Sequence, residues 1–175
     1  VPPTAPLELS IYEAGATGDA ILFDNNVMII GWTDAEKGVI GILESVAIVN
    51  SSDRSFVSNV EQTGTMDFLR FSLPPSYLNL DVQSNLGGGQ VVPIDRGFGL
   101  TTPIPPGRHE ILFTYLIEYE GSVLSFMRSF PFGANSFEVM IPEDLATLTI
   151  PGLEVIDSAN IGDTRFFTVQ GRDIS

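Results

Sequence analysis

Apolar and polar residues alternate along much of this chain, and that period of two constrains its fold more than any other feature. The clearest run is Glu110–Glu120. One face of this run is aromatic and aliphatic, and it carries Ile111, Phe113, Tyr115, Ile117 and Tyr119. The other face is mixed, which is typical of a strand packed on one side in an antiparallel sheet. Helical periodicity is nearly missing, and only Glu143–Ala146 is expected to make a helical turn.

A hairpin is predicted after this strand. Glu120-Gly121 is typical of a two-residue turn, because glycine readily adopts a positive φ. The turn would pair apolar with apolar residues: Ile117 with Leu124, Tyr115 with Phe126 and Ile111 with Phe130. Arg128 would face Phe113 on the apolar side. We expect it near the sheet edge or over a ring, held by a carboxylate.

Other short strands are expected along the chain. Val39–Asn50 has apolar residues on both faces and should be buried on both sides. The remaining predicted strands are Leu7–Glu13, Val27–Trp32, Phe68–Leu73, Val91–Ile94, Ser136–Ile141, Thr147–Ile150 and Arg165–Val169. Turn residues such as Asp24-Asn25-Asn26 separate them. About ten short strands with turn chemistry between them predict an all-β fold, an antiparallel β-sandwich of immunoglobulin-like or jelly-roll type.

The length of 175 residues favours one domain. The Pro142–Ala146 stretch is the candidate boundary. We therefore predict a β-sandwich domain over residues 1–145 and a C-terminal strand segment over 146–175, packed on the same domain. The chain opens and closes like a piece excised from a longer protein.

Charge and cysteine content exclude several classes of function. The 22 acidic and 8 basic residues give a net charge of −14, which repels phosphate backbones, so nucleic acid is not an expected partner. The acidity fits solvation, a salty habitat or cation binding. Cysteine is absent, which excludes disulfides, zinc–thiolate sites and cysteine nucleophiles. The longest uncharged run, Val82–Ile94, is too short to span a membrane, so no insertion by this segment is expected.

The residues that catalysis needs do not form a recognisable pattern, and we predict that the chain is not an enzyme. The only histidine, His109, precedes the best strand, and no Gly-x-Ser-x-Gly elbow occurs. Glu118 and Glu120 are about 6.8 Å apart along a strand, a spacing usable for glycoside hydrolysis, but they sit where charges commonly face water. Gly87–Gly89 lacks the Lys-Ser/Thr ending of a phosphate loop. No catalytic residue is assigned.

No cofactor is expected, and calcium is the ligand that the sequence favours most. Hard oxygen ligands are offered by Asp24, Asn25, Asn26, Asp34 and Glu36, in expected loops at the two ends of one short strand. If those loops converge, they form a metal site. The same residue types dominate ordinary turns, which is the competing interpretation.

Carbohydrate binding by sandwich folds relies on exposed aromatic rings. The candidates are Trp32, the only tryptophan, and Tyr77, which follows Pro74-Pro75 in an expected loop. The competing interpretation is that both rings pack in or at the rim of the core.

The order of turn and strand motifs between Gly38 and Ile141 resembles that of a loosely defined group of prokaryotic membrane-anchored extracytoplasmic β-sandwich proteins. It comprises Asn50–Phe56, the strand end Phe71–Pro74, the segment Gly97–Gly107 and the aromatic strand after it, with Gly162–Phe167 as the usual ending. The resemblance implies a signal peptide before the region, a membrane helix after it and an extracytoplasmic, tethered location. The group has no established activity, so the resemblance assigns no site residues.

These observations favour a non-catalytic extracytoplasmic binding or spacer module of a membrane-anchored surface or envelope protein, with a protein or glycan partner. The alternative is a calcium- or carbohydrate-binding adhesion-type module. Convergence of Asp24–Asn26, Asp34, Glu36 and Trp32 at one exposed end would favour that alternative.

Overall fold

A computed structural model describes residues 10–58, 68–121, 124–125, 127–130, 132–145 and 154–174, and it confirms the all-β prediction. The strands are β1 (Ala14–Ala16), β2 (Ile21–Asp34), β3 (Val39–Asn50), β4 (Ser55–Phe56), β5 (Leu69–Ser72), β6 (Tyr77–Ser84), β7 (Val91–Ile94), β8 (Gly97–Leu100), β9 (Gly107–Glu118), β10 (Ala134–Pro142), β11 (Glu154–Ile161) and β12 (Thr164–Ile174). The helical content of these residues is a single 3₁₀ turn, Gly18–Ala20.

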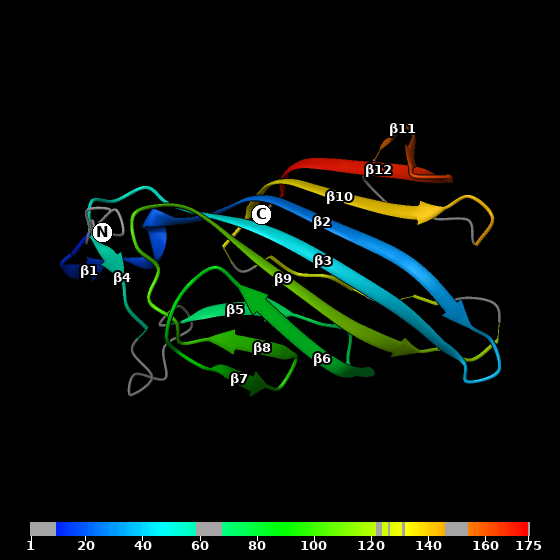
Figure 1. The fold of residues 1–175 in the computed structure, drawn as a ribbon, viewed down its shortest axis with the longest axis horizontal. Coiled ribbons are helices and arrows are strands. Elements are labelled where there is room, and N and C mark those ends of the chain that lie inside the picture. The colour runs from blue at the N-terminus through cyan, green and yellow to red at the C-terminus, as the bar shows by residue number, and fades with distance from the viewer. Residues whose placement is uncertain are drawn as a thin grey trace, which may run out of the picture.

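Seven strands form one curled sheet in the order β11-β12-β10-β2-β3-β9-β6 (Figure 1). All neighbours in it are antiparallel except β10 and β2, which run parallel. The parallel pair is possible because β2 and β10 lie far apart in the sequence, so their connection need not be a hairpin. The predicted strands Val39–Asn50 and Val91–Ile94 are confirmed as β3 and β7, residue for residue.

A three-stranded sheet, β5-β8-β7, packs against one face of the large sheet through aromatic rings. Phe71 of β5 stacks on Phe98 of β8, with ring centroids 4.7 Å apart. Both rings meet Phe113 of β9 edge-on, at 5.5 and 5.1 Å. These rings are almost fully buried, so the two sheets form a sandwich-like core with the alternating apolar face of β9 at its centre.

The predicted hairpin after β9 is wrong. Both edges of β9 are already occupied, by β3 on one side and β6 on the other. Of the residues assigned to the second strand, Leu124, Arg128 and Phe130 are outside any strand, and Phe126 lies outside the described residues. Leu124 and Phe130 instead pack against the hydrophobic core without joining a strand.

Two local predictions also need correction. Asp24-Asn25-Asn26 is not a turn but part of the long strand β2, where the pairing with β3 shifts by one residue between Phe23 and Asn25. Such a bulge lets polar residues continue a strand. Residues 10–13 of the predicted strand Leu7–Glu13 are not in a strand, and its first part lies outside the described residues, as does Thr147–Ile150.

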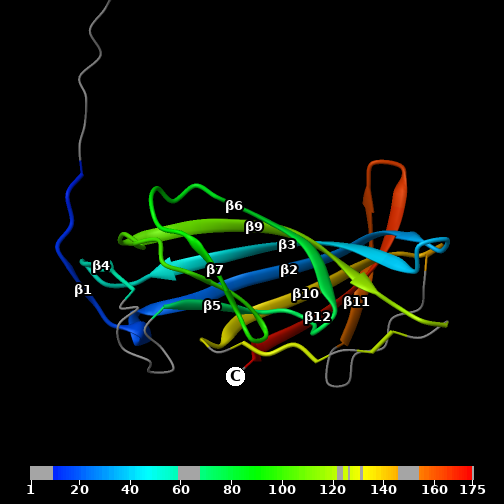
Figure 2. The same ribbon diagram turned by 90° about the horizontal axis from the view of Figure 1, so that it is seen from below.

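The C-terminal segment contributes β11 and β12, and β12 pairs with β10 in the seven-stranded sheet. Figure 2 shows the hairpin of these two strands projecting at one end of the sheet. Within the described ranges, no helix is both long and apolar enough to cross a membrane.

Candidate functional site: an apolar outer face and a buried polar cluster

The two faces of the seven-stranded sheet differ in their covering. Side chains that point toward the three-stranded sheet, such as Ile42, Val46 and Ile111, are buried. We call the opposite side the outer face. Many of its side chains at the centre of the sheet are also apolar. Ala47 and Met140 are buried there, whereas five others are only partly buried: Val27, Ile29, Leu43, Leu112 and Leu116. An apolar sheet face that keeps contact with water is the first candidate for a binding surface.

Trp32 lies on this outer face and leaves 49% of its surface exposed. It pairs with Gly41 of β3, which pairs with Leu116 of β9, which pairs with Leu78 of β6. Leu78 is itself 40% exposed. These four residues form a line across four strands, which we call the Trp32 row. Trp32 is therefore exposed on the face of the sheet and is not packed in the core.

Two glycines place the indole there. A shift in the β2–β3 pairing between Ile30 and Trp32 leaves Gly31 unpaired, and this bulge sets the side to which Trp32 points. Gly41 then gives the ring room. A Cβ at Gly41 would lie 2.9 Å from Cζ2 of Trp32 and closer still to Nε1 and Cε2. The indole therefore lies on the backbone of β3.

The substitution Gly41→Val is expected to lift the Trp32 ring off the sheet, because the new side chain fills the space that the ring occupies. Since Trp32 is the only tryptophan, its emission maximum should move several nanometres to longer wavelength. Gly31→Ala is the matched control, because its Cβ would meet only the Gly41 carbonyl oxygen, at 4.0 Å. An unchanged emission maximum in Gly41→Val would contradict this placement.

The outer face is also hollowed at one place. A groove of about 410 Å³ is lined by Gln83, Ser84, Asn85, Glu110 and Leu112, and we call it the Glu110 groove. The Glu110 carboxylate accepts a hydrogen bond from the Ser45 hydroxyl at 3.1 Å. Leu112 belongs both to this groove and to the apolar centre of the face, so the two features are continuous.

The predicted calcium ligands do not come together. Asp24 accepts hydrogen bonds from Arg108 and from Asn135, the latter at 3.0 Å. The Arg108 bond, followed by the Asn135 bond, lowers the pKa of Asp24. Asn25 accepts a hydrogen bond from the Ser136 hydroxyl at 2.8 Å. Asn26 points to the buried face, where neither its side-chain nitrogen nor its oxygen has a partner among the described residues.

Asp34 and Glu36 lie at the other end of β2. Ten residues of strand separate Asp34 from Asp24, which is about 33 Å. Asp34 forms an ion pair with Lys37 at 3.0 Å, and this contact lowers its pKa. Across the described residues, no group of three or more histidine, aspartate and glutamate side chains is placed to hold a metal. The two acidic segments therefore do not converge, although a calcium site required it, and calcium binding stays a prediction.

The other residues named from the sequence have local roles. Tyr77 begins β6 rather than lying in a loop, packs partly against the core and donates its hydroxyl to the Gly97 carbonyl at 3.2 Å. It is therefore not an exposed platform. The His109 ring shares a hydrogen bond with the Pro105 carbonyl at 2.8 Å. Glu118 ends β9 in an exposed position.

A buried polar cluster lies on the opposite, inner face. Glu44 of β3 is 0% exposed and accepts a hydrogen bond from the Tyr115 hydroxyl at 2.6 Å. It also pairs with Arg128, whose side chain is almost completely buried. The Arg128 guanidinium lies 5.9 Å from the centre of the Phe130 ring. The expectation that Arg128 would be held by a carboxylate next to an aromatic ring is confirmed.

The electrostatics of this cluster suit structure better than catalysis. Burial raises the pKa of Glu44, and the nearby Arg128 and Tyr115 limit that rise. Burial, followed by the charge of Glu44, raises the pKa of Tyr115. A phenol held in its neutral form and a carboxylate already engaged by two donors are poorly prepared to act as nucleophile or base. The cluster holds the segment around Arg128 against the sheet.

Glu44 was missed at the sequence level, although it left a signal. The alternating positions of Val39–Asn50 carry Ile40, Ile42, Val46 and Ile48 on one face, and Glu44 fills the vacant place in that series. A charge at the centre of an apolar face requires a partner. Arg128 was the equivalent exception in its own alternating segment, so the two exceptions mark the two partners.

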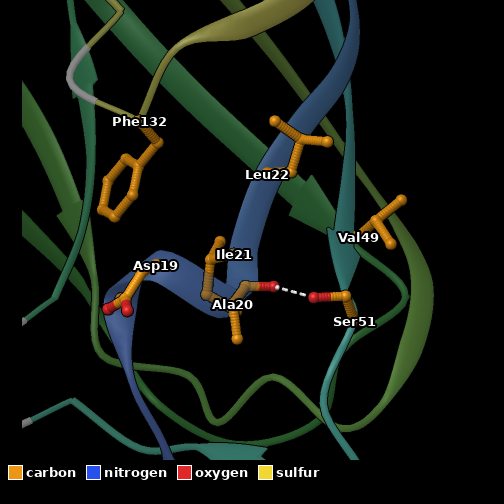
Figure 3. A pocket seen from close by; sticks show the side chains of 8 residues that line it. Asp19, Ala20, Ile21, Leu22, Val49, Ser51 and Phe132 are labelled. Carbon is orange, nitrogen blue, oxygen red and sulfur yellow. Dashed lines mark hydrogen bonds between the residues drawn. The ribbon is translucent and has the colours of Figure 1, made fainter.

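A second hollow lies where β2 begins (Figure 3). It measures about 350 Å³ and is lined by Gly18, Asp19, Ala20, Ile21, Leu22, Val49, Ser51 and Phe132. The Ser51 hydroxyl donates a hydrogen bond to the Ala20 carbonyl at 3.1 Å, which joins the β2 start to the end of β3. Asp19 is the one ionisable residue in this lining. A single carboxylate beside apolar walls does not make an acid–base pair.

No protein-family model matches the chain, and no curated protein matches its sequence. Solved structures that align with this chain include an M1 zinc metallopeptidase from Deinococcus radiodurans, at 11% identity and a TM-score of 0.44. They also include a variant of it bound to a Tyr-Ser-Ala substrate, at 10% identity and a TM-score of 0.47. The matches cover 87% and 86% of this chain. The chain spans 39% of each of those proteins. A likeness at this level says nothing about activity.

Proposed function

We propose that this chain is a non-catalytic binding module of a membrane-anchored surface or envelope protein, and that it binds its partner through the outer face of the seven-stranded sheet. The Trp32 row is the observation that carries this proposal. A half-exposed tryptophan next to a 40% exposed Leu78 offers apolar area that a partner can remove from water. Tryptophan is also among the residues that contribute most binding energy at interfaces.

The preorganisation of Trp32 supports the same role. Its ring lies on the backbone at Gly41, so little side-chain freedom is left to lose on binding. Met127, another exposed apolar residue at 85%, lies outside any strand and has no such support. The supported ring of Trp32 is therefore a better contact site than the exposed Met127 side chain.

Selection of ligands from a displayed peptide library tests the binding face. We expect the ligands enriched on the wild-type chain to lose at least tenfold in affinity for Trp32→Ala. Tyr12→Ala is the matched control, because Tyr12 is equally exposed, at 45%, but lies outside the strands. Ligands that bind Trp32→Ala as well as the wild type would refute the proposed face.

The proposal of an extracytoplasmic, tethered location rests on the order of turn and strand motifs, which resembles that of membrane-anchored extracytoplasmic proteins. The acidic, cysteine-free composition agrees with this location. An epitope placed in the Gly87–Gly89 loop of the full-length protein tests the location. Labelling of intact cells by an impermeant antibody is the expected result. Labelling only after permeabilisation would contradict it.

Carbohydrate binding is the second candidate, and the exposed face of the Trp32 indole favours it, since sugars stack on such rings. A glycan array separates the two candidates. If a glycan binds the wild-type chain but not Trp32→Ala, and the peptide library yields no Trp32-dependent ligand, the adhesion-type interpretation replaces the protein-binding one.

A further inference from the structure

The outer face combines an apolar centre with carboxylates that have no cation. In the described part of the chain, the ion pairs join Lys37 to Asp34, Arg54 to Glu13, Arg108 to Asp24, Arg128 to Glu44 and Arg165 to Glu143. On the outer face, four carboxylates take part in none of these pairs: Asp81, Glu110, Glu118 and Glu138. Within the described residues, the apolar area is thus bordered by carboxylates that take part in no ion pair.

Glu110 is the best placed of these carboxylates. It stands in a groove and not on a flat surface, and the Ser45 hydroxyl bonds to one of its oxygens. The Asn85 side-chain oxygen accepts the backbone N–H of Glu110 at 3.3 Å, which fixes the strand at this point. Ser45 is a neutral donor, so this hydrogen bond does not pair the Glu110 carboxylate with a positive charge.

The spacing between the groove and the Trp32 row defines what fits. Glu110 and Leu116 are on the same face of β9 and six residues apart, which is about 20 Å along the strand. Between them lie Leu112 and Thr114, which are partly buried and uncharged. A ligand that lies along this face of β9 meets apolar surface between Leu116 and Leu112 and the Glu110 carboxylate in the groove at the far end.

We infer that the partner is a protein segment with aliphatic or aromatic side chains for the Trp32 row and a lysine or arginine for the Glu110 groove. This inference rests on the proposed binding function and specifies the chemistry of the partner. Charge complementarity selects the basic residue, because a positive side chain is the group that the groove carboxylate lacks. A second copy of this chain fits poorly, since it would bring the same carboxylates together.

A synthetic peptide with leucines in one half and lysines in the other is the probe, and Trp32 is the reporter because it is the only tryptophan. We expect saturable quenching or a blue shift of its emission. The analogue with glutamate for lysine should bind at least tenfold more weakly, and the analogue with serine for leucine should lose a similar factor. Binding of the lysine peptide should also weaken as salt rises.

Paired variants locate the contact. Glu110→Gln should weaken binding about tenfold, the loss expected for one charge-assisted hydrogen bond. Asp95→Asn, in the turn between β7 and β8, removes the same charge elsewhere and should change nothing. Leu78→Ser should weaken binding several-fold. Its control is Val91→Ser, at a residue of similar exposure on β7.

The outcomes separate this inference from the proposed function. Equal binding of the lysine and glutamate peptides, or equal losses in Glu110→Gln and Asp95→Asn, would overturn the inference and leave the binding face intact. Failure of the lysine peptide to change Trp32 emission would overturn it too. The proposed binding face itself fails if library-selected ligands also bind independently of Trp32.

Discussion

Replacing Arg128 with leucine is expected to lower the free energy of unfolding by about 3–5 kcal/mol near neutral pH, the range found when one partner of a buried ion pair is removed. The reason is the position of Glu44, which is fully buried and would keep only the Tyr115 hydroxyl as a partner. Chemical denaturation followed by circular dichroism measures the difference. Arg54→Leu, which removes an exposed ion pair with Glu13, should change stability little.

The loss should depend on pH in a defined direction. Burial raises the pKa of Glu44, so the folded state holds this proton more tightly than the unfolded state does. Glu44 then contributes stability that is complete below its unfolded pKa and is lost as the pH rises through its folded pKa. Arg128 limits the rise of that pKa, so its removal extends the loss to higher pH. The deficit of Arg128→Leu should be small near pH 4 and larger at pH 8.

A second substitution tests the cause. Glu44→Gln in the Arg128→Leu background removes the buried charge but leaves an acceptor for the Tyr115 hydroxyl, so it should restore part of the lost stability and flatten the pH dependence. If the deficit is the same at pH 4 and pH 8 and glutamine restores nothing, the loss comes from packing of the Arg128 side chain instead of its charge.

The alternation of apolar and polar residues predicted where strands form better than it predicted which strands pair in the sheet. The β9 pattern and the double-sided pattern of β3 give their strand character, because the period of two reports which side chains are buried. The hairpin failed because pattern and turn chemistry are local, whereas each strand edge accepts one neighbour. Strand β3, more than fifty residues earlier, occupies the edge of β9 that the hairpin needed.

The candidate site was predictable only in its separate parts. Trp32 could be named as the single tryptophan, but its position depends on a pairing shift at Gly31 and on the partner residue Gly41. Neither follows from the sequence near Trp32. The calcium candidates do not converge for a similar reason. The bulge after Phe23 lets the polar residues Asp24 and Asn25 continue strand β2, so the chain makes no turn there. The candidate ligands at the two ends of β2 therefore stay far apart.

Gly97→Ala is expected to be the most damaging small substitution, with a loss of about 4 kcal/mol or more or a failure to fold. Gly97 begins β8 with a φ of +122°, a conformation that alanine rarely adopts. It also pairs with Ser72 of β5. An added Cβ would lie 2.9 Å from the Leu73 nitrogen and far inside contact distance of the Phe71 carbonyl oxygen. These atoms are backbone, so a rotamer change cannot relieve the clash.

Gly107→Ala separates the two contributions to the stability loss in Gly97→Ala, the clash of the added Cβ and the strain of a positive φ. Gly107 has a similar φ of +104°, yet a Cβ there would meet nothing within 4 Å. It should therefore cost only the backbone strain, about 1–3 kcal/mol. The excess loss in Gly97→Ala measures how tightly β5 and β8 are joined beneath the Phe71–Phe98 stack. Urea denaturation of the two variants supplies the comparison. Equal losses would mean that the two strands can separate without disturbing the aromatic core.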